Sequence, residues 1–259
     1  MALVVDMNCD MGESFGAWRL GADEEMLSHV TSANVACGFH AGDPGVMART
    51  VRAAKAKGVR VGAHPGLPDL VGFGRRDMAI SPEEAYRDTL YQIGALDAFC
   101  RAEGWALQHV KPHGQLNNMA VRDKHLAEAI AAAVRDYGGG LILVPYGGEL
   151  MHAAEGLRLR VAREVYADRA YNADGTLVSR SVAGSVLHDP EEVALRAVDM
   201  VRDGRIRAVS GEWVELRADT VCLHGDTPGA SGLAARLWTA FAEAGIAVRP
   251  MQEIVAGRS

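Results

Sequence analysis

Apolar runs of strand character alternate with amphipathic stretches of helical period along most of the chain. The predicted strands span residues 3–10, 33–38, 59–63, 105–113, 141–144, 161–169 and 220–226. The predicted helices span residues 44–57, 82–103, 121–137, 149–155 and 233–244, and a further helix starts at residue 189. This alternation is typical of an α/β fold built on a parallel sheet. Seven strands, most of them followed by a helix, favour a single (β/α)-barrel domain over residues 1–259.

The first predicted strand carries polar residues at alternate positions, Asp6, Asn8 and Asp10. Alternate residues of a strand share one face, so two carboxylates and an amide would enter an otherwise apolar interior. Burying such groups is costly unless they find partners, which makes this strand a candidate site. A solvated strand end that runs into the glycine-rich turn at residue 12 is the alternative.

Histidines stand where several later strands end, and a barrel gathers its active site at the carboxyl ends of its strands. Clustered imidazoles beside carboxylates suit acid–base chemistry or metal binding. The predicted catalytic residues are Asp10, His64, Lys111, His113, His224 and Asp226. The candidate metal ligands are Asp10, His40, His64 and His113. Each histidine taken singly is more often an ordinary surface or core residue, so the prediction depends on their common position.

Lys111 lies two residues before His113, and Pro112 ends the strand ladder because proline has no N–H to donate. We expect the Lys111 ammonium to reach the mouth of the barrel. There it would be a fixed positive charge for a phosphate or a developing oxyanion. A snorkelling lysine with no catalytic role is the alternative.

A second set of residues is predicted to bind substrate or phosphate. No G-x-G-x-x-G or P-loop pattern occurs, so a nucleotide would need another device. Residues 225–232 could form such a binding site if Thr227 caps the following helix and Pro228 starts it. The free backbone N–H groups at the start of that helix would then face an anion. Arginines near the strand ends would suit bidentate carboxylate binding, with plain capping and surface ion pairs as alternatives. The predicted binding set is Asn8, Glu13, His40, Arg75, Asp168, Arg169, Thr227 and Gly229.

Composition excludes several classes of partner. The 259 residues are 49% hydrophobic and 23% charged with a formal net charge of −6, and the basic residues are scattered. We therefore expect no binding to nucleic acid or to an anionic membrane. The first residues lack the pattern of a secretory leader and no window resembles a membrane span, so we expect a cytoplasmic protein. The four cysteines form no C-x-x-C pair and are expected to be reduced and buried.

Six motifs together resemble the LamB/YcsF family, which provides the A component of the ATP-hydrolysing 5-oxoprolinase. They lie at residues 6–16, 33–44, 62–76, 110–114, 167–169 and 224–230, and the resemblance spans nearly the whole chain. The family's fourth motif usually reads Lys-Pro-His-Gly-Ala-Leu-Tyr-Asn. Here Gln115 and Asn117 replace the alanine and the tyrosine, which removes an aromatic ring from that corner.

The resemblance implies a seven-stranded barrel related to glycoside hydrolases and polysaccharide deacetylases. It also implies ATP-dependent opening of 5-oxo-L-proline to L-glutamate with partner subunits B and C, so ATP and Mg²⁺ are the expected cofactors. A five-membered lactam is a poor electrophile, and phosphorylation would turn its amide oxygen into a leaving group. Such a site needs cations for phosphate, a base for water and a clamp for the substrate carboxylate.

Two other functions are compatible with the same residues. One is a metal-dependent, deacetylase-like hydrolase that binds a transition metal through Asp10 and two of His40, His64 and His113. The other is a non-catalytic subunit that binds the substrate and presents it to a partner. ATP could bind this chain or a partner subunit.

Overall fold

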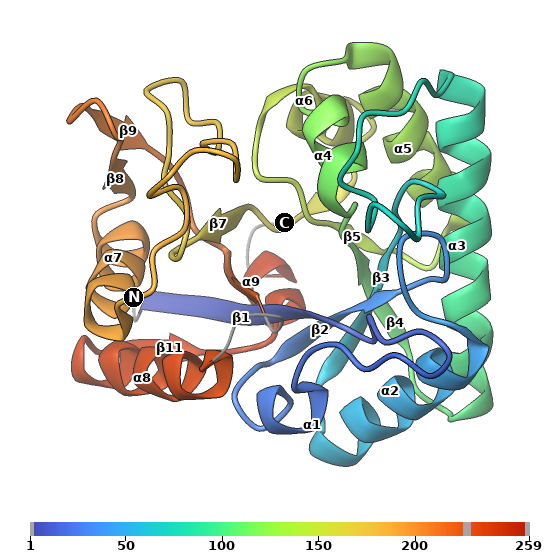
Figure 1. Cartoon of the computed structure of the whole chain (residues 1–259), viewed down its shortest axis with the longest axis horizontal. Helices are drawn as coiled ribbons and strands as arrows, with labels where there is room; N and C mark the ends of the chain where they lie inside the picture. The colour runs from blue at the N-terminus through green and yellow to red at the C-terminus, as the bar shows by residue number, and fades with distance from the viewer. Residues whose placement is uncertain (1–2, 225–228, 257–259) are drawn as a thin grey trace.

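The computed structural model describes residues 3–224 and 229–256, and its main feature is a parallel sheet. The central strand is β1 (Leu3–Met11), which crosses the middle of Figure 1 and pairs with β2 (Ser32–Ala36) and β10 (Thr220–His224). The other parallel strands are β3 (Arg60–His64), β4 (Leu107–Val110), β5 (Ile142–Leu143), β6 (Arg160–Val161), β7 (Glu164–Tyr166) and β11 (Ile246–Val248). Their order is β6-β5-β4-β3-β2-β1-β10-β7, and β11 pairs with the start of β1.

The two edge strands of this sheet, β6 and β7, follow each other directly in the chain. β6 pairs with β5 and β7 pairs with β10, and only Ala162 and Arg163 separate β6 from β7. The backbone N–H of Glu164 also donates to the carbonyl of Pro145, which follows β5. The sheet therefore curls round into a barrel. If 160–166 counts as one bent strand, seven strands surround its interior in the described residues, so the predicted seven-stranded (β/α) barrel is confirmed.

Helices cover the outside of the barrel (Figure 1). They are α1 (Asp23–Met26), α2 (Pro44–Lys57), α3 (Pro82–Ala102), α4 (Gly114–Ala120), α5 (Lys124–Tyr137), α6 (Gly148–Gly156), α7 (Pro190–Arg202), α8 (Ala230–Glu243) and α9 (Met251–Ala256). Asp43, Ser81 and Asp189 each accept backbone N–H bonds as N-caps, and proline follows each of them. Proline suits the first position because its missing N–H would have no partner in the helix. These three helix starts were predicted from the sequence.

Two predicted helices begin elsewhere. The predicted helix at 121–137 is α5, which starts at Lys124 because Asp123 caps it by accepting from the N–H groups of His125 and Leu126. Helix α4, which lies just before the predicted range, was not predicted. Helix α8 begins at Ala230 with Gly229 as its N-cap, in the left-handed conformation. Thr227, the predicted cap of this helix, lies outside the described residues.

An antiparallel pair, β8 (Arg205–Arg207) and β9 (Trp213–Glu215), lies outside the barrel and was not predicted. Each strand has only three residues, with the less exposed one, Ile206 or Val214, in the middle, so the alternation is too short to be recognised in the sequence. The segment at 171–180, predicted as a hairpin or flap, forms a short turn in which the N–H of Asn172 donates to the carbonyl of Thr176, with the isolated bridge between Tyr171 and Leu177 beside it.

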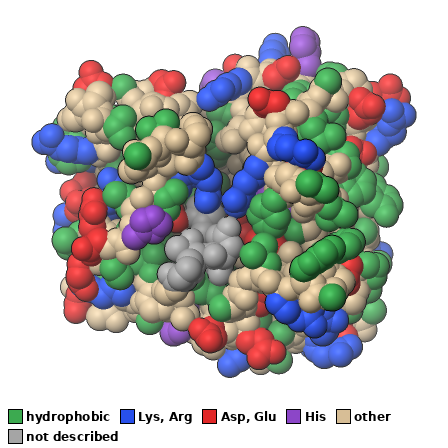
Figure 2. Space-filling view, in the orientation of Figure 1, with side chains coloured by type: hydrophobic (Ala, Val, Ile, Leu, Met, Phe, Trp, Pro, Cys, Tyr) green, Lys and Arg blue, Asp and Glu red, His purple; other side chains and the backbone are tan. Residues whose placement is uncertain are grey.

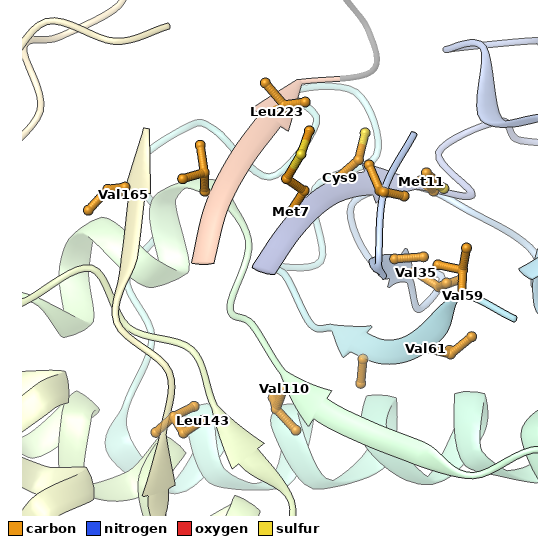
Figure 3. Close-up of a cluster of buried hydrophobic side chains, with 14 of the residues drawn as sticks. Met7, Cys9, Met11, Val35, Val59, Val61, Val110, Leu143, Val165 and Leu223 are labelled. Atoms are coloured by element: carbon orange, nitrogen blue, oxygen red, sulfur yellow. The ribbon is translucent and has the colours of Figure 1, made fainter. Parts of the chain in front are cut away.

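The apolar core lies between the barrel and its helices. Along β1 the residues at 5, 7, 9 and 11 are buried and apolar, whereas those at 6, 8 and 10 are polar. Figure 3 shows the apolar set beside its neighbours from the other strands, with Met7, Cys9, Met11, Val35, Val61, Val110, Val165 and Leu223 among those labelled. Because alternate side chains point to opposite faces, the polar set faces the barrel interior.

Two further sequence expectations concern burial. All four cysteines, Cys9, Cys37, Cys100 and Cys222, are free and buried, as predicted. None of the helices in the described part of the chain has the length and apolar character needed to cross a bilayer.

Candidate active site

The amino-terminal level of the barrel interior is organised around Asp6, which is fully buried. Its carboxylate accepts hydrogen bonds from the hydroxyls of Thr31, Ser32 and Thr220, and from the backbone N–H of Met251. Burial raises the pKa of Asp6 from 3.8 to about 6, although these donors oppose the rise. Its partners in the described residues are neutral groups, so this level is a closed structural network.

The next level is a chain of amides and an imidazole. The side-chain amide of Asn8 donates to the Thr220 hydroxyl at 2.7 Å. The side-chain amide of Asn34 donates to the side-chain oxygen of Asn8, also at 2.7 Å. The Nε2 atom of His109 lies 2.7 Å from the Asn34 carbonyl oxygen. Burial lowers the pKa of His109 to about 3, so its ring is neutral. Asn8, predicted to bind substrate, is fully buried and instead positions its neighbours.

Lys111 lies inside the barrel and is only 2% exposed. Its Nζ is 2.8 Å from Asp10 Oδ1, 3.0 Å from Glu164 Oε1 and 3.0 Å from the sulfur of Cys222. Burial disfavours the ammonium, but attraction to Asp10 and Glu164 outweighs burial and raises the pKa of Lys111 well above its usual value. Lys111 is therefore a fixed positive charge among buried anions.

Asp10 connects this lysine to the histidines. Its Oδ1 atom accepts from Lys111 and, at 2.8 Å, from the amide of Asn34. Its Oδ2 atom is 3.3 Å from Nε2 of His64. The Asp10 side chain is 12% exposed, so it lies at the boundary between the buried network and the cavity above it. One carboxylate thus contacts both a fixed cation and a group that can exchange a proton.

Three imidazoles and a second carboxylate gather at the mouth of the barrel. The rings of His40 and His113 stack with their centroids 3.7 Å apart, and His64 meets both of them edge-on. Glu13 Oε1 lies 3.7 Å from Nε2 of His40 and 4.0 Å from Nδ1 of His113. One ligand atom from each of these four residues lies within 4.8 Å of all the others. The cluster matches the predicted metal ligands, with Glu13 in place of Asp10.

A cavity of about 480 Å³ opens above these groups, a size suited to a small ligand. Asp10, His64, Lys111 and His113 contribute to its lining. Basic side chains line it as well, namely Arg75, Arg122, Arg169 and Arg180. Figure 2 shows Lys and Arg side chains gathered around the hollow in the middle of this face. The cavity therefore favours an anionic ligand.

The predicted binding residues divide into those at the cavity and those used elsewhere. Arg75 is exposed at the cavity, with its guanidinium 4.7 Å from the ring centroid of Phe73. Arg169 lines the cavity too, but its Nε and Nη2 donate to the carbonyls of Ser185 and Val178. These two bonds hold the 178–185 segment, and the remaining N–H groups of the guanidinium are the ones that a carboxylate clamp would use.

Three other predicted residues lie at the end of the barrel strands or after them. Asp168 is buried just after β7, and its carbonyl accepts from the N–H of Leu187. Gly229 is exposed at the start of α8. His224 ends β10 and pairs in register with Asp10 of β1. The side chain of His224, and residues Asp226 and Thr227, lie outside the described part of the chain.

Glu164, Tyr166 and Cys222 contact Lys111 and were not predicted as site residues. The Tyr166 hydroxyl donates to the Glu164 carboxylate, and its ring centroid is 5.5 Å from Lys111 Nζ. Glu164 and Tyr166 are alternate residues of a short buried strand, the same signal that singled out β1. Applying that rule to every strand would have found them.

Comparisons with known proteins agree on one family. The model of the LamB/YcsF family matches residues 5–256. The A component of 5-oxoprolinase from Thermococcus onnurineus is 56% identical over 252 residues, which cover 97% of this chain and 99% of that protein. The crystal structure of a lactam utilization protein from Thermus thermophilus is similar with a TM-score of 0.91 and 52% identity, covering 96% of this chain and 100% of the other.

A more distant likeness concerns the fold alone. The structure of T48 deacetylase with substrate has a TM-score of 0.53 and 13% identity, covering 99% of this chain and 92% of that one. The expected relationship of this barrel to the deacetylase fold is therefore confirmed.

Proposed function

Because the chain belongs to the LamB/YcsF family over nearly its whole length, we propose that it is a component of an ATP-dependent 5-oxoprolinase. The reaction is the opening of the lactam ring of 5-oxo-L-proline to give L-glutamate. Relatives named as the A component of 5-oxoprolinase or as a lactam utilization protein support this assignment. The naming of those relatives as one subunit of an enzyme supports partners, which we take to be subunits B and C of the same enzyme.

The observation that carries the proposal is the buried Lys111–Asp10 pair beneath an arginine-lined cavity. Phosphoryl transfer to the lactam oxygen places negative charge at that oxygen. Attack of water on the adjacent ring carbon places negative charge at the same position. A preorganised cation stabilises such charge best where water is excluded. Lys111 meets both requirements, because it is charged and almost completely buried.

The neighbouring groups have complementary roles in the proposed reaction. Asp10 serves as the base for water or as a ligand of Mg²⁺, and its Oδ2 atom faces His64. With no metal ion bound to them, His64 and His113, whose ring nitrogens lie 2.9 Å apart, transfer protons during ring opening. The arginines of the cavity bind the substrate carboxylate and phosphate oxygens, with Arg75 and Arg122 as the clamp. ATP with Mg²⁺ supplies the phosphoryl group, bound in this cavity or by a partner subunit.

Reconstitution tests this assignment. Glutamate formation from 5-oxoproline and ATP is measured for this chain alone, for subunits B and C alone, and for the three together. We expect turnover only in the complete mixture and only with ATP. No glutamate in the complete mixture, with each component folded, would overturn the proposal.

A second measurement separates a catalytic subunit from one that only presents substrate. Asp10→Asn is compared with the wild type for 5-oxoproline binding by calorimetry and for turnover in the assembled enzyme. A catalytic role predicts retained binding with lost turnover. Unchanged binding together with unchanged turnover would show a non-catalytic, presenting subunit.

The histidine cluster favours a second candidate, a metal-dependent, deacetylase-like hydrolase that needs no ATP. The two candidates differ in one measurable requirement. Hydrolysis of N-acetylated sugars by this chain alone, dependent on added Zn²⁺ and independent of ATP, would favour the second.

A further inference from the structure

The tautomers of two histidines at the barrel mouth follow from their backbone partners. Nδ1 of His64 lies 2.6 Å from the carbonyl oxygen of Lys111, and Nε2 of His113 lies 2.8 Å from that of Phe73. A carbonyl oxygen can only accept, so both of these nitrogens carry a hydrogen. In the neutral rings the remaining nitrogens, Nε2 of His64 and Nδ1 of His113, therefore carry lone pairs.

These two lone-pair nitrogens face each other at 2.9 Å. Two acceptors at this distance repel unless a cation lies between or beside them. A shared proton is one such cation. A metal ion is the other, and neutral imidazole nitrogens are good ligands for it.

The remaining members of the cluster supply further donors. His40 is completely buried, and neither of its ring nitrogens has a hydrogen-bond partner among the described residues. Such orphaned polar atoms are rare in a folded interior and require an explanation. The Nε2 atom of His40 lies 3.7 Å from Glu13 Oε1, a carboxylate oxygen at the same opening.

We propose that the three imidazoles and the carboxylate at the barrel mouth hold one divalent transition-metal ion. The ligands are His40, His64, His113 and Glu13. In a tetrahedral site with bonds of about 2.0–2.1 Å, neighbouring ligand atoms are roughly 3.3 Å apart. The separations of 2.9, 3.7 and 4.0 Å bracket that value, so small side-chain adjustments complete the shell.

The donor set defines the class of ion. Imidazole nitrogens with one carboxylate suit Zn²⁺, Co²⁺, Fe²⁺ or Ni²⁺, whereas Mg²⁺ and Ca²⁺ prefer oxygen ligands. Asp10 is excluded from the set because its Oδ1 atom is paired with Lys111, although its Oδ2 atom remains beside His64. His64 and His113 also line the cavity, so a bound ion would lie at its floor, and it would polarise a carbonyl oxygen there only by taking a fifth ligand.

Metal binding by this chain alone tests the proposal without substrate, ATP or partner subunits. The protein is purified without a histidine tag, stripped with a chelator and titrated with Zn²⁺ by calorimetry and with Co²⁺ by visible absorption. We expect one ion per chain, a Co²⁺ spectrum of low coordination number, and a rise in melting temperature with metal. No stoichiometric binding would overturn the proposal and leave a shared proton between His64 and His113.

Matched variants locate the ion. His113→Ala should weaken binding by more than about 100-fold, beyond the loss expected for a residue that only orients a ligand. Glu13→Gln keeps the shape of the side chain and should change the Co²⁺ spectrum, so the test survives if His113→Ala does not fold. The control variant combines His125→Ala with His152→Ala, two exposed histidines near Glu128 and Glu149. Loss of the ion in this control alone would place it on the surface and overturn the proposal.

The outcome is independent of the proposed lactam reaction. Metal binding with no glutamate formation in the complete mixture would refute the enzyme assignment alone. Glutamate formation by a chain that binds no metal would refute the metal site alone.

Discussion

Asp6 and Asp10 lie on the same face of β1, four residues apart, yet their surroundings differ completely. Asp6 is enclosed by hydroxyls and one backbone N–H, and burial raises its pKa to about 6. Asp10 contacts the ammonium of Lys111 and the ring of His64, and it borders the cavity. The residue type is the same, so the partners decide what each carboxylate does.

The comparison divides the barrel interior into two levels. At the amino-terminal end, neutral donors satisfy the buried carboxylate of Asp6 and close the barrel. This arrangement is structural. At the carboxyl-terminal end, a fixed cation, Lys111, and the histidine rings surround the partly exposed carboxylate of Asp10. This arrangement is typical of a reactive group. Changes at the first level should therefore alter stability, and changes at the second should alter turnover.

The largest effect is expected for Lys111→Met, which removes the cation of the upper level. Turnover of the assembled enzyme should fall by about 100-fold or more, the scale for loss of a preorganised electrostatic group. The free energy of unfolding should also fall by about 3–5 kcal/mol, because Asp10 and Glu164 lose their buried partner. Steady-state kinetics and denaturant unfolding measure both, with Lys124→Met on the surface as control. A large loss of stability with near-normal turnover would reduce Lys111 to a structural residue.

The second prediction compares the two carboxylates directly. Asp10→Asn should lower kcat of the assembled enzyme by about 100-fold, because the amide is neither a base nor a counter-charge for Lys111. Asp6→Asn should leave kcat near the wild-type value, since its side chain is remote from the cavity lining. An equal loss in both variants would show that the two levels are not functionally separate.

The third prediction is the pH dependence of stability contributed by Asp6. Its native pKa is raised above the ordinary value of 3.8, so this contribution is fully present below about pH 4 and is lost as pH rises through about 6. Raising a pKa from 3.8 to about 6 corresponds to roughly 3 kcal/mol. Urea unfolding of wild type and Asp6→Asn at several pH values should show their difference changing by about that amount, in favour of Asn at high pH. A difference that is independent of pH would mean that Asp6 titrates normally.

The smallest effect is expected from a methyl group placed against the histidine cluster. A Cβ at Gly66 would lie 2.4 Å from Nδ1 of His40, so Gly66→Ala must displace that ring. We expect a loss of about 1–3 kcal/mol in stability and weaker Zn²⁺ binding. Gly94→Ala is the control, because nothing lies within 4 Å of its Cβ and alanine stabilises a helix by about 1 kcal/mol. Unchanged Zn²⁺ binding in Gly66→Ala would remove His40 from the ligand set.

Much of the fold was predictable because its signals are local. The alternation along β1, and the Asp-Pro and Ser-Pro starts of α2, α3 and α7, depend only on neighbouring residues. The convergence of His40, His64 and His113 was also predictable, because parallel strands in a barrel bring their carboxyl ends together. A rule about strand direction was enough to place these side chains near one another.

The details that the sequence left open depend on distances between strands. Whether Arg169 faces a ligand or the carbonyls of Val178 and Ser185 is decided by how the 178–185 segment folds back. Asp10 lies between His64 and Lys111, and Lys111 approaches from the β4 side of the barrel, three strands away from β1 in the sheet order. No local pattern encodes such a choice between competing partners.

The buried cysteines can report local opening of the folded chain. Burial raises the pKa of the Cys37 and Cys100 thiols to about 12 and that of Cys222 well above its usual value, so thiolate is scarce while the chain is folded. Alkylation at each sulfur therefore requires a local opening that exposes it. Because the Cys222 sulfur touches Lys111, its labelling rate reports how often the centre of the barrel admits solvent. Ligands that close the cavity should slow that labelling well before they change the overall melting temperature.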